Sequence, residues 1–505
     1  MQLSSEENEP FITAAFDQRV DRCLCSQIMR HTSPDDNSAD ARNVISLLVE
    51  SLVFLWTKQS TIHERNESRL RGLEILPHLL TLWNTQQKDS RLPLALLSIF
   101  RSWAKIQEFT IKSLLIKTGL LQSLSVMFER KGDAVLWPHG VGLMKDLMFR
   151  ASSGEKEKMY EHWVDHVVHV LPKDNCADAA SACLWNWAVD ESLALRMAVH
   201  VRLWATLALC QPTFTSQSSQ RNTLSTVGSI LSVCSSRLEE APTPVQKHAT
   251  WFIAFLLRTL DDSDDGDLRR RAVRTIRCLS SCRWGREILR NHFGNAHGLV
   301  QRLTRLLPNQ QEQDDTRVQV CLAMKYWLPH LNECWSHVGP YIERSLVKII
   351  QDDCSSEKVI MNSMQVLNTC FEFSPWKRGA GCLSDEFFGR LSDILKEHIT
   401  EKEYHDLIVS LLCQITSKAN NPDGESLVLA NPKVVDILAL LLSEFEASTT
   451  KAIEAIETAV KHESSRKLFV EHECLLTNLV NVCILSSGDR KSVAKSLLVS
   501  LVSDL

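Results

Sequence analysis

Tyrosine, glycine and proline are scarce in this chain of 505 residues, with 4, 17 and 15 copies respectively. Such a composition leaves little room for a β-rich protein and favours helices. No stretch approaches 18 uncharged apolar residues, and the amino terminus lacks the basic and apolar segments of a secretory signal. The sequence therefore predicts an all-helical chain without a transmembrane segment, located in the cytoplasm or the nucleus.

Signatures of catalysis are also missing. The chain contains no Gly-x-x-x-x-Gly-Lys-Ser/Thr phosphate loop, no Gly-x-Ser-x-Gly elbow and no His-Glu-x-x-His zinc motif. The formal net charge is −5, so any binding of nucleic acid or acidic membrane must come from a local patch. We therefore expect a non-enzymatic protein without a cofactor.

The cysteines and histidines do not predict a metal site. The 16 cysteines are scattered, and many lie within apolar helical runs, as at Cys183, Cys210, Cys321, Cys370 and Cys483. We interpret them as reduced core residues. His162, His166 and His169 can share one helical face, where paired histidines sometimes bind zinc, but no further ligands accompany them. A surface or groove-lining histidine stripe is the favoured interpretation.

A weak repeat of about 44 residues runs along nearly the whole chain. An apolar helical stripe returns every 36 to 49 residues, at Leu76, Leu120, Val167, Leu203, Phe252, Leu299, Leu346, Leu391, Val434 and Leu475. This period is typical of an α-solenoid, in which a unit cannot bury its own apolar face and stacks on its neighbours. The predicted fold is an all-α, right-handed superhelix of about ten units.

The two ends of the chain differ from the repeat. Residues 1–40 contain a predicted helix over about 11 to 30 and a polar break over 31 to 40, which together we interpret as an amino-terminal cap. Residues 41–505 form the predicted solenoid, with a last helix from Lys491 to Leu505 as the opposite cap. Solenoids mostly hold other molecules, so we expect a binding scaffold.

Local motifs indicate the kind of repeat. A short helix and a glycine precede an apolar second helix, as in Lys117-Thr118-Gly119 before Leu120-Leu121-Gln122-Ser123-Leu124. The segment Cys183-Leu184-Trp185-Asn186-Trp187-Ala188 closely matches the Ala-Leu-x-Asn-Leu-Ala pattern of armadillo third helices. From about residue 60 to 505 the chain resembles the armadillo repeat family, with HEAT-like repeats of similar period as the alternative.

The resemblance implies where a ligand would bind. In peptide-binding armadillo proteins the third helices line a concave groove, where Asn amides donate to and accept from the backbone of an extended ligand. The corresponding positions here are Ser102, Asp146, Asn186, Ser232, Cys278, Tyr326, Asn368, Gln414 and Thr458. This sparse ladder makes Asn186, Trp187 and Asn368 candidate partner-binding residues. Alternatively, the two asparagines bond to the backbone of a neighbouring unit.

Residues 267–305 stand out by their charge. They hold ten arginines against two acidic residues, a local charge of +8 in a chain of net −5. Arg270, Arg274 and Arg277 are spaced to share one helical face, and Arg302 and Arg305 form a second pair on the next apolar helix. Guanidinium groups suit carboxylates and phosphates. We therefore expect these arginines to anchor an acidic or phosphorylated protein.

Other interpretations of this segment stay open. The same arginines could serve a nucleic-acid or phosphoinositide adaptor, and the chain could be a regulatory subunit of an enzyme complex. The preceding Asp261, Asp262, Asp264 and Asp265 could also neutralise part of the charge and leave a solvated helix face. A calcium loop fails because Ala272 stands where a glutamate ligand is needed. Asp265 or Asp267 is instead expected to cap the following helix.

A first prediction follows from the missing ligand and disulfide patterns. Thermal melting of the purified protein should be indifferent to chelator and to reductant, because burial of apolar helix faces alone holds the predicted fold together. Stoichiometric zinc that is lost together with stability on chelation would contradict this prediction.

Overall fold

Every regular element in the described part of the computed structural model is a helix, as the composition predicted. The structure describes residues 20–31, 39–58, 72–85, 91–105, 109–117, 119–129, 134–210, 214, 216–293, 296–309, 312–331, 335–373, 383–398, 400–418, 431–444, 449–461, 463–486 and 488–503. The chain divides into two compact units, Met1–Phe252 and Ile253–Leu505. Each unit is a stack of helices in which neighbouring elements pack side by side.

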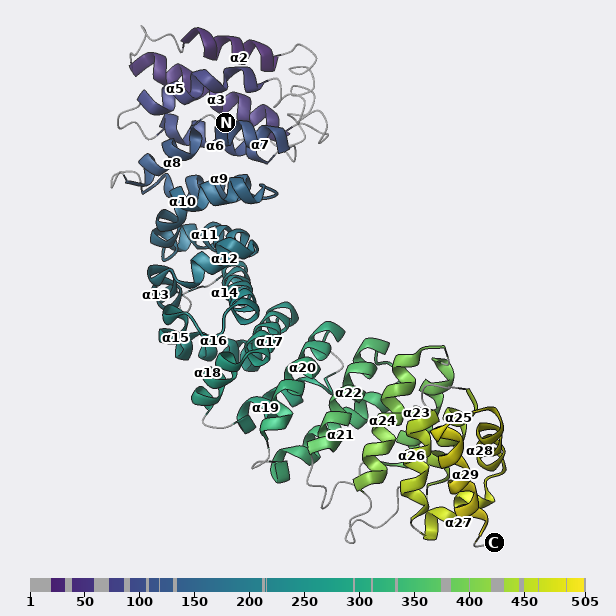
Figure 1. Ribbon diagram of the computed structural model, residues 1–505. Coiled ribbons are helices and arrows are strands. Elements are labelled where there is room, and N and C mark those ends of the chain that lie inside the picture. The colour runs from purple at the N-terminus through teal and green to yellow at the C-terminus, as the bar shows by residue number, and fades with distance from the viewer. Residues whose placement is uncertain are drawn as a thin grey trace. The chain divides into compact units, whose positions relative to one another are not determined.

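The first unit consists of two layers of stacked helices, named here after the second and third helices of the predicted repeat (Figure 1). Its second-helix layer stacks in the order α5 (Leu76–Thr85), α8 (Leu120–Glu129), α10 (Ser153–Val170) and α13 (Val201–Cys210). Its third-helix layer stacks in the order α3 (Ala39–Lys58), α6 (Arg91–Ala104), α9 (Trp137–Met148), α11 (Asp174–Ala188) and α14 (Gln217–Arg237). The short first helices are η1 (Gly72–Ile75), α7 (Phe109–Lys117), α12 (Glu191–Ala198) and α15 (Thr243–Lys247).

The second unit repeats this arrangement. Its second-helix layer contains α19 (Ala296–Leu306), α21 (Trp335–Gln351), α23 (Asp385–Glu397), α25 (Pro432–Glu444) and α28 (Glu473–Leu485). Its third-helix layer contains α17 (Gly266–Ser281), α20 (Asp314–Trp327), α22 (Glu357–Phe373), α24 (Lys402–Lys418), α26 (Thr449–Val460) and α29 (Asp489–Val502). Short connecting helices are α18 (Arg283–Phe293), η3 (Leu328–His330) and α27 (Glu463–Glu471), while α16 (Ala249–Asp262) crosses the division between the units.

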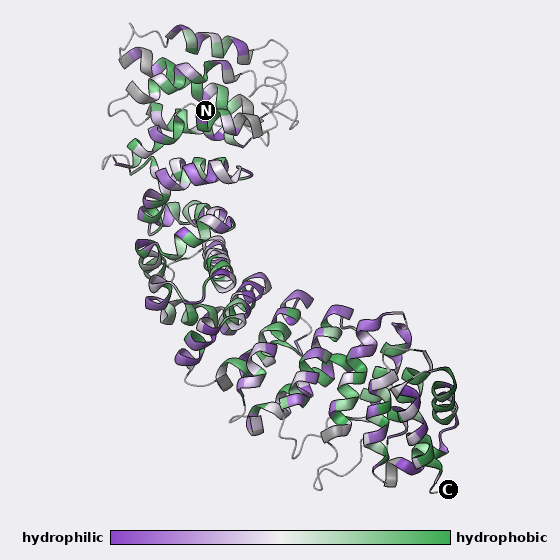
Figure 2. Ribbon diagram, viewed as in Figure 1, coloured by the Kyte–Doolittle hydropathy of each residue, from purple (hydrophilic) through white to green (hydrophobic). Residues whose placement is uncertain are grey.

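The predicted repeat is confirmed in register. Nine of the ten stripe positions lie on helices of the two second-helix layers, and the tenth, Phe252, lies on α16. None of these ten side chains is more than 2% exposed. Apolar and polar residues are segregated along many of the helices (Figure 2). Each stripe is therefore part of the continuous core between the stacked helices.

Large aromatic side chains link neighbouring repeats. The indole of Trp163 donates to the carbonyl oxygen of Leu121, 42 residues earlier, at 3.0 Å. Trp327 donates to Ser280 Oγ at 2.8 Å, across a separation of 47 residues. Both tryptophans are fully buried. Because a buried indole N–H is costly to leave unpaired, each bond fixes one repeat against the next.

Several cysteines occupy the core as predicted. Cys183, Cys210, Cys321 and Cys370 are buried, and Cys483 is half-buried. Burial raises the pKa of the Cys321 thiol to about 12 and that of Cys210 to about 11. These side chains therefore behave as small apolar groups rather than as nucleophiles.

The helix ends follow local rules. Asp265 caps α17 as expected, with its carboxylate accepting from the N–H groups of Asp267 and Leu268. Ser152 and Glu155 form a capping box at the start of α10. The predicted break at Leu171–Asp174 separates α10 from α11.

The predicted chain ends are described only in part. Of the amino-terminal segment, α2 (Val20–His31) packs against α3, while residues 1–19 and 32–38 lie outside the described residues. The boundary at residue 40 thus stays a prediction. The last helix is α29, ending at Val502.

No single described helix is long and apolar enough to cross a bilayer, although α12 and α13, which meet at a bend of 81°, qualify as a pair by length and composition alone.

Close packing at one glycine yields a second prediction. A Cβ atom on Gly285 would lie 2.2 Å from the carbonyl oxygen of Leu279 and 2.8 Å from Cys282 Sγ. Gly285→Ala should therefore destabilise the protein by about 1 to 3 kcal/mol, the usual cost of overpacking. The matched control is Gly389→Ala in α23, where a Cβ meets nothing within 4 Å. The urea midpoint of the Gly389→Ala control should equal or exceed that of the wild type. An unchanged midpoint for Gly285→Ala would refute the close contact.

Candidate functional site

The third-helix layer carries the positions at which the armadillo resemblance places ligand contacts. Every ladder position lies on a third helix, from Ser102 on α6 to Thr458 on α26. The residue at the α20 position, Tyr326, is 39% exposed. The sequence therefore predicted correctly which helix carries each ladder residue.

The two asparagines of the ladder have partners within the protein. Asn186 Nδ2 donates to the carbonyl oxygen of Ala182 in its own helix at 2.9 Å. Asn368 Nδ2 donates to Ser410 Oγ on α24 at 3.1 Å, so it links two repeats through a side chain. Trp187 is fully buried and packs edge-on against Tyr160, with ring centroids 5.4 Å apart. Trp187 thus lies in the core, where it supports the helix that carries Asn186.

The arginine face of α17 is directed toward α20. Arg277 Nη1 donates to Gln319 Oε1 at 2.9 Å, and Arg270 Nη1 lies 3.9 Å from Asp315 Oδ2. Arg270, Arg274 and Arg277 share one side of α17 by their helical spacing, and Gln319 and Tyr326 are likewise one face of α20. We call these five residues the α17–α20 face.

Much of the arginine charge is compensated inside the fold. Arg271 Nε lies 2.8 Å from Asp267 Oδ2, and Arg270 pairs with the same carboxylate. Burial raises the pKa of Asp267, but hydrogen bonds from Arg271 and Arg270 outweigh it and lower that pKa overall. Arg269 forms an ion pair with the almost fully buried Glu312, at 2.5 Å but without hydrogen-bond alignment. These acids limit the uncompensated positive charge of the segment.

Arg274 is the exception on this face. Its side chain is exposed and has no hydrogen-bond or ion-pair partner among the described residues. Its neighbours on the face, Arg270 and Arg277, are half-buried and held by partners. The Arg274 guanidinium is therefore exposed beside two arginines that already have partners. A free guanidinium suits a carboxylate or a phosphate.

The structure separates the second arginine pair from this face. Arg302 and Arg305 lie on α19, in the second-helix layer. Arg302 pairs with Asp261 on α16 at 3.2 Å, while Arg305 is exposed. The five arginines within these 36 residues therefore divide between two layers.

The histidine stripe lies on α10, in the second-helix layer of the first unit. His166 stacks on Phe128 with ring centroids 5.6 Å apart, and His169 packs edge-on against Trp137 at 5.6 Å. His162 is exposed. The described residues contain no group of three His, Cys, Asp or Glu side chains that could hold a metal ion. Two of the three histidines thus contribute aromatic packing at the surface.

The sequence and the fold were compared with those of known proteins. No family model and no curated protein matches the sequence. An engineered protein matches 86% of this chain and 98% of its own length, with 15% identity and a TM-score of 0.62. A chain from a structure on a phosphorylation switch that controls the interaction between cadherin and beta-catenin matches 94% of this chain and 99% of its own, with 12% identity and a TM-score of 0.58.

A designed armadillo repeat protein matches half of this chain and 99% of its own length, with 15% identity and a TM-score of 0.41. The stacked helices of each unit, together with the matches at TM-scores of 0.62 and 0.58, place the chain in the class of all-α solenoids. More particularly, its repeats are armadillo-like.

His166 yields a third prediction, on pH. Burial lowers the pKa of this histidine, and the nearby carboxylates of Glu129 and Asp165 oppose the shift only in part. Because its folded pKa lies below the unfolded value of about 6.5, the unfolded chain binds more protons once the pH falls below that value. Above the unfolded pKa, His166 is neutral in both states and does not change the free energy of unfolding. As the pH falls from that value toward the folded pKa, His166 lowers the free energy of unfolding progressively.

The measurement is the change in melting temperature between about pH 7.5 and about pH 5.5. His166→Gln should lose less stability over this interval than the wild type does. The control is His162→Gln, which removes an exposed histidine from the same helix and should keep the wild-type slope. An identical slope in the His166 variant would show that this residue does not contribute.

Proposed function

We propose that this protein is a non-enzymatic scaffold that binds an acidic or phosphorylated segment of a partner protein on its α17–α20 face. The observation that carries the proposal is Arg274, an exposed guanidinium on a third helix without a partner among the described residues. The α17–α20 face offers this charge together with the partly exposed ring of Tyr326. Arginine and tyrosine are the residue types that most often dominate protein interfaces.

The fold supports protein binding as the general role. A chain of closely similar length and fold comes from a structure that concerns the interaction between cadherin and beta-catenin and its control by phosphorylation. Stacked repeats form extended surfaces that suit elongated ligands. We place the protein in the cytoplasm or the nucleus as part of this proposal.

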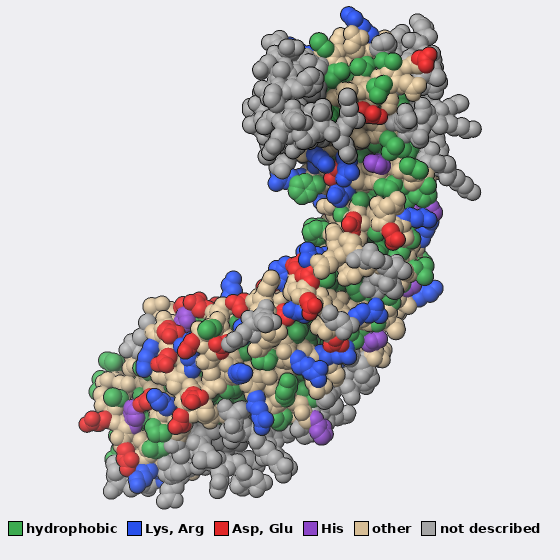
Figure 3. Space-filling model, turned by 180° about the vertical axis from the view of Figure 1, so that it is seen from behind, with side chains coloured by type: hydrophobic (Ala, Val, Ile, Leu, Met, Phe, Trp, Pro, Cys, Tyr) green, Lys and Arg blue, Asp and Glu red, His purple; other side chains and the backbone are tan. Residues whose placement is uncertain are grey.

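A nucleic-acid or phosphoinositide ligand fits the charges less well. Binding to a phosphate backbone needs several uncompensated cations, whereas Arg270 and Arg271 on α17 pair with Asp267. Acidic and basic side chains are interspersed over much of the described surface that Figure 3 shows. A role as the regulatory subunit of an enzyme complex is compatible with the same binding face.

The fourth prediction tests Arg274. Arg274→Glu should reduce capture of the bound partner from native cells by at least tenfold, which corresponds to about 1.4 kcal/mol. The melting temperature should change little, because exposed charge substitutions usually cost within about 0.5 kcal/mol. Arg270 is left unchanged because it also holds Asp267.

Two matched variants complete the experiment. Arg258→Glu on α16 reverses another exposed arginine and should retain full capture. Arg305→Glu reverses the exposed arginine of α19 and should also retain it. Equal capture by Arg274→Glu and wild type would refute the proposed face, and an equal loss in the Arg305 variant would move the site to the second-helix layer. A steep fall of binding with salt would favour a phosphate-backbone ligand.

A further inference from the structure

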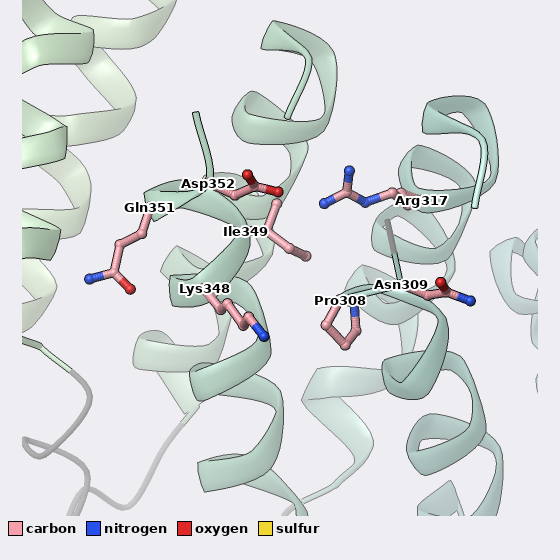
Figure 4. A pocket seen from close by; sticks show the side chains of 7 residues that line it. All are labelled: Pro308, Asn309, Arg317, Lys348, Ile349, Gln351 and Asp352. Carbon is pink, nitrogen blue, oxygen red and sulfur yellow. The ribbon is translucent and has the colours of Figure 1, made fainter. Parts of the chain in front are cut away.

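A cavity in the second unit lies apart from the α17–α20 face. Its volume is about 530 Å³, and it is lined by Pro308, Asn309, Arg317, Lys348, Ile349, Gln351 and Asp352. One wall comes from the turn between α19 and α20 and from α20, and the other from the end of α21 and the residue after it. Figure 4 shows the guanidinium of Arg317 reaching across from one wall toward Ile349 and Asp352, with Lys348 below it.

Arg317 is a buried cation with a fixed orientation. Its side chain is 5% exposed. Nε donates to the carbonyl oxygen of Leu307 at 3.0 Å, and Nη2 donates to Ser355 Oγ at 3.0 Å. Two of its three nitrogens are therefore held by neutral oxygens of the fold, so the guanidinium is preorganised rather than free to rotate.

The remaining nitrogen has only a weak counter-ion. Arg317 Nη1 lies 3.5 Å from Asp314 Oδ1, and that aspartate side chain is 50% exposed. A contact of this length to a solvated carboxylate contributes little. The more deeply buried Glu312 is 2.5 Å from Arg269 and so belongs to another pair. The guanidinium thus keeps capacity for an oxygen ligand at Nη1.

The other charged groups of the cavity define the ligand. Lys348 is exposed on α21 and has no ion-pair partner among the described residues. Asp352 accepts from the Cys354 N–H at 3.1 Å and from Ser355 Oγ at 3.3 Å, so its oxygens are engaged by their own turn. The cavity therefore offers two cations, while Asp352 adds a negative charge that disfavours a doubly charged ligand.

We propose that this cavity binds a carboxylate at Arg317 Nη1, with the Lys348 ammonium on the opposite wall adding a second favourable charge. A singly charged planar group matches two cations beside one retained aspartate better than a phosphate dianion does. The ligand can be a free small acid or the side chain of a glutamate or aspartate in a peptide, because both present the same chemistry.

The fifth prediction distinguishes these sources by isothermal titration of the full-length protein at low salt. One probe is butyrate, a small acid with a single negative charge, and the other is a short blocked peptide with a single glutamate flanked by glycine and serine. The same peptide with glutamine is the neutral control. At least one carboxylate probe should bind with a Kd at or below about 1 mM, and the glutamine peptide should bind at least tenfold more weakly.

Three variants test the residues involved. Lys348→Ala, an exposed change that should not affect folding, should weaken binding at least tenfold. Lys358→Ala removes an exposed lysine of α22 outside the cavity lining and should bind as the wild type does. Arg317→Lys keeps the charge but loses the hydrogen bonds to Leu307 and Ser355, so it should also bind at least tenfold more weakly, with its melting temperature as the check on folding.

The outcomes decide the proposal. Binding of the peptide but not of butyrate identifies a protein side chain as the ligand, and binding of butyrate alone identifies a small acid. No saturation by either probe at about 10 mM, or equal affinity of wild type and Lys348→Ala, overturns the proposal. Arg274→Glu should leave binding unchanged, so this site and the α17–α20 face can fail independently.

Discussion

The structure depends on the burial of one apolar stripe per repeat between neighbouring helices. A single repeat cannot cover its own second helix, so each stripe residue reaches full burial only when further repeats stack on either side. Leu203, Leu299 and Leu391 illustrate this, because each is completely buried although its helix is only 10 to 13 residues long. The tryptophan hydrogen bonds from α10 to α8 and from α20 to α17 also fix the orientation of one repeat relative to the next, because a hydrogen bond is directional and apolar packing is not.

This stacking leaves the third helices with polar positions that the core does not need. Some of those positions connect repeats, as Asn368 does with Ser410 and Arg277 with Gln319. A polar group that bonds to the next repeat is unavailable to a partner, whereas Arg274, on the same helix as Arg277, is exposed. Binding capacity in such a fold therefore resides in the few polar side chains that repeat stacking does not occupy.

The same distinction explains which parts of the site the sequence could predict. Helical spacing correctly placed Arg270, Arg274 and Arg277 on one side of one helix, and the aspartate run correctly suggested a cap for it. Spacing could not show that Arg302 pairs with Asp261 while Arg274 has no partner among the described residues, because a pairing depends on which side chains other segments bring close. Nor did any local signal mark Arg317, whose burial results from residues 307 and 355, ten positions before it and 38 positions after it.

By itself, the sequence determined the helical fold, the repeat length and the register of the stripe, because these follow from apolar periodicity within each helix. It also determined the local charge of residues 267–305. Only the tertiary structure decided which charges remain available, since Glu312, Asp315 and Asp261 reach the arginines from other segments of the chain. Periodicity describes one helix at a time, whereas the compensation of a charge depends on which helices pack beside it.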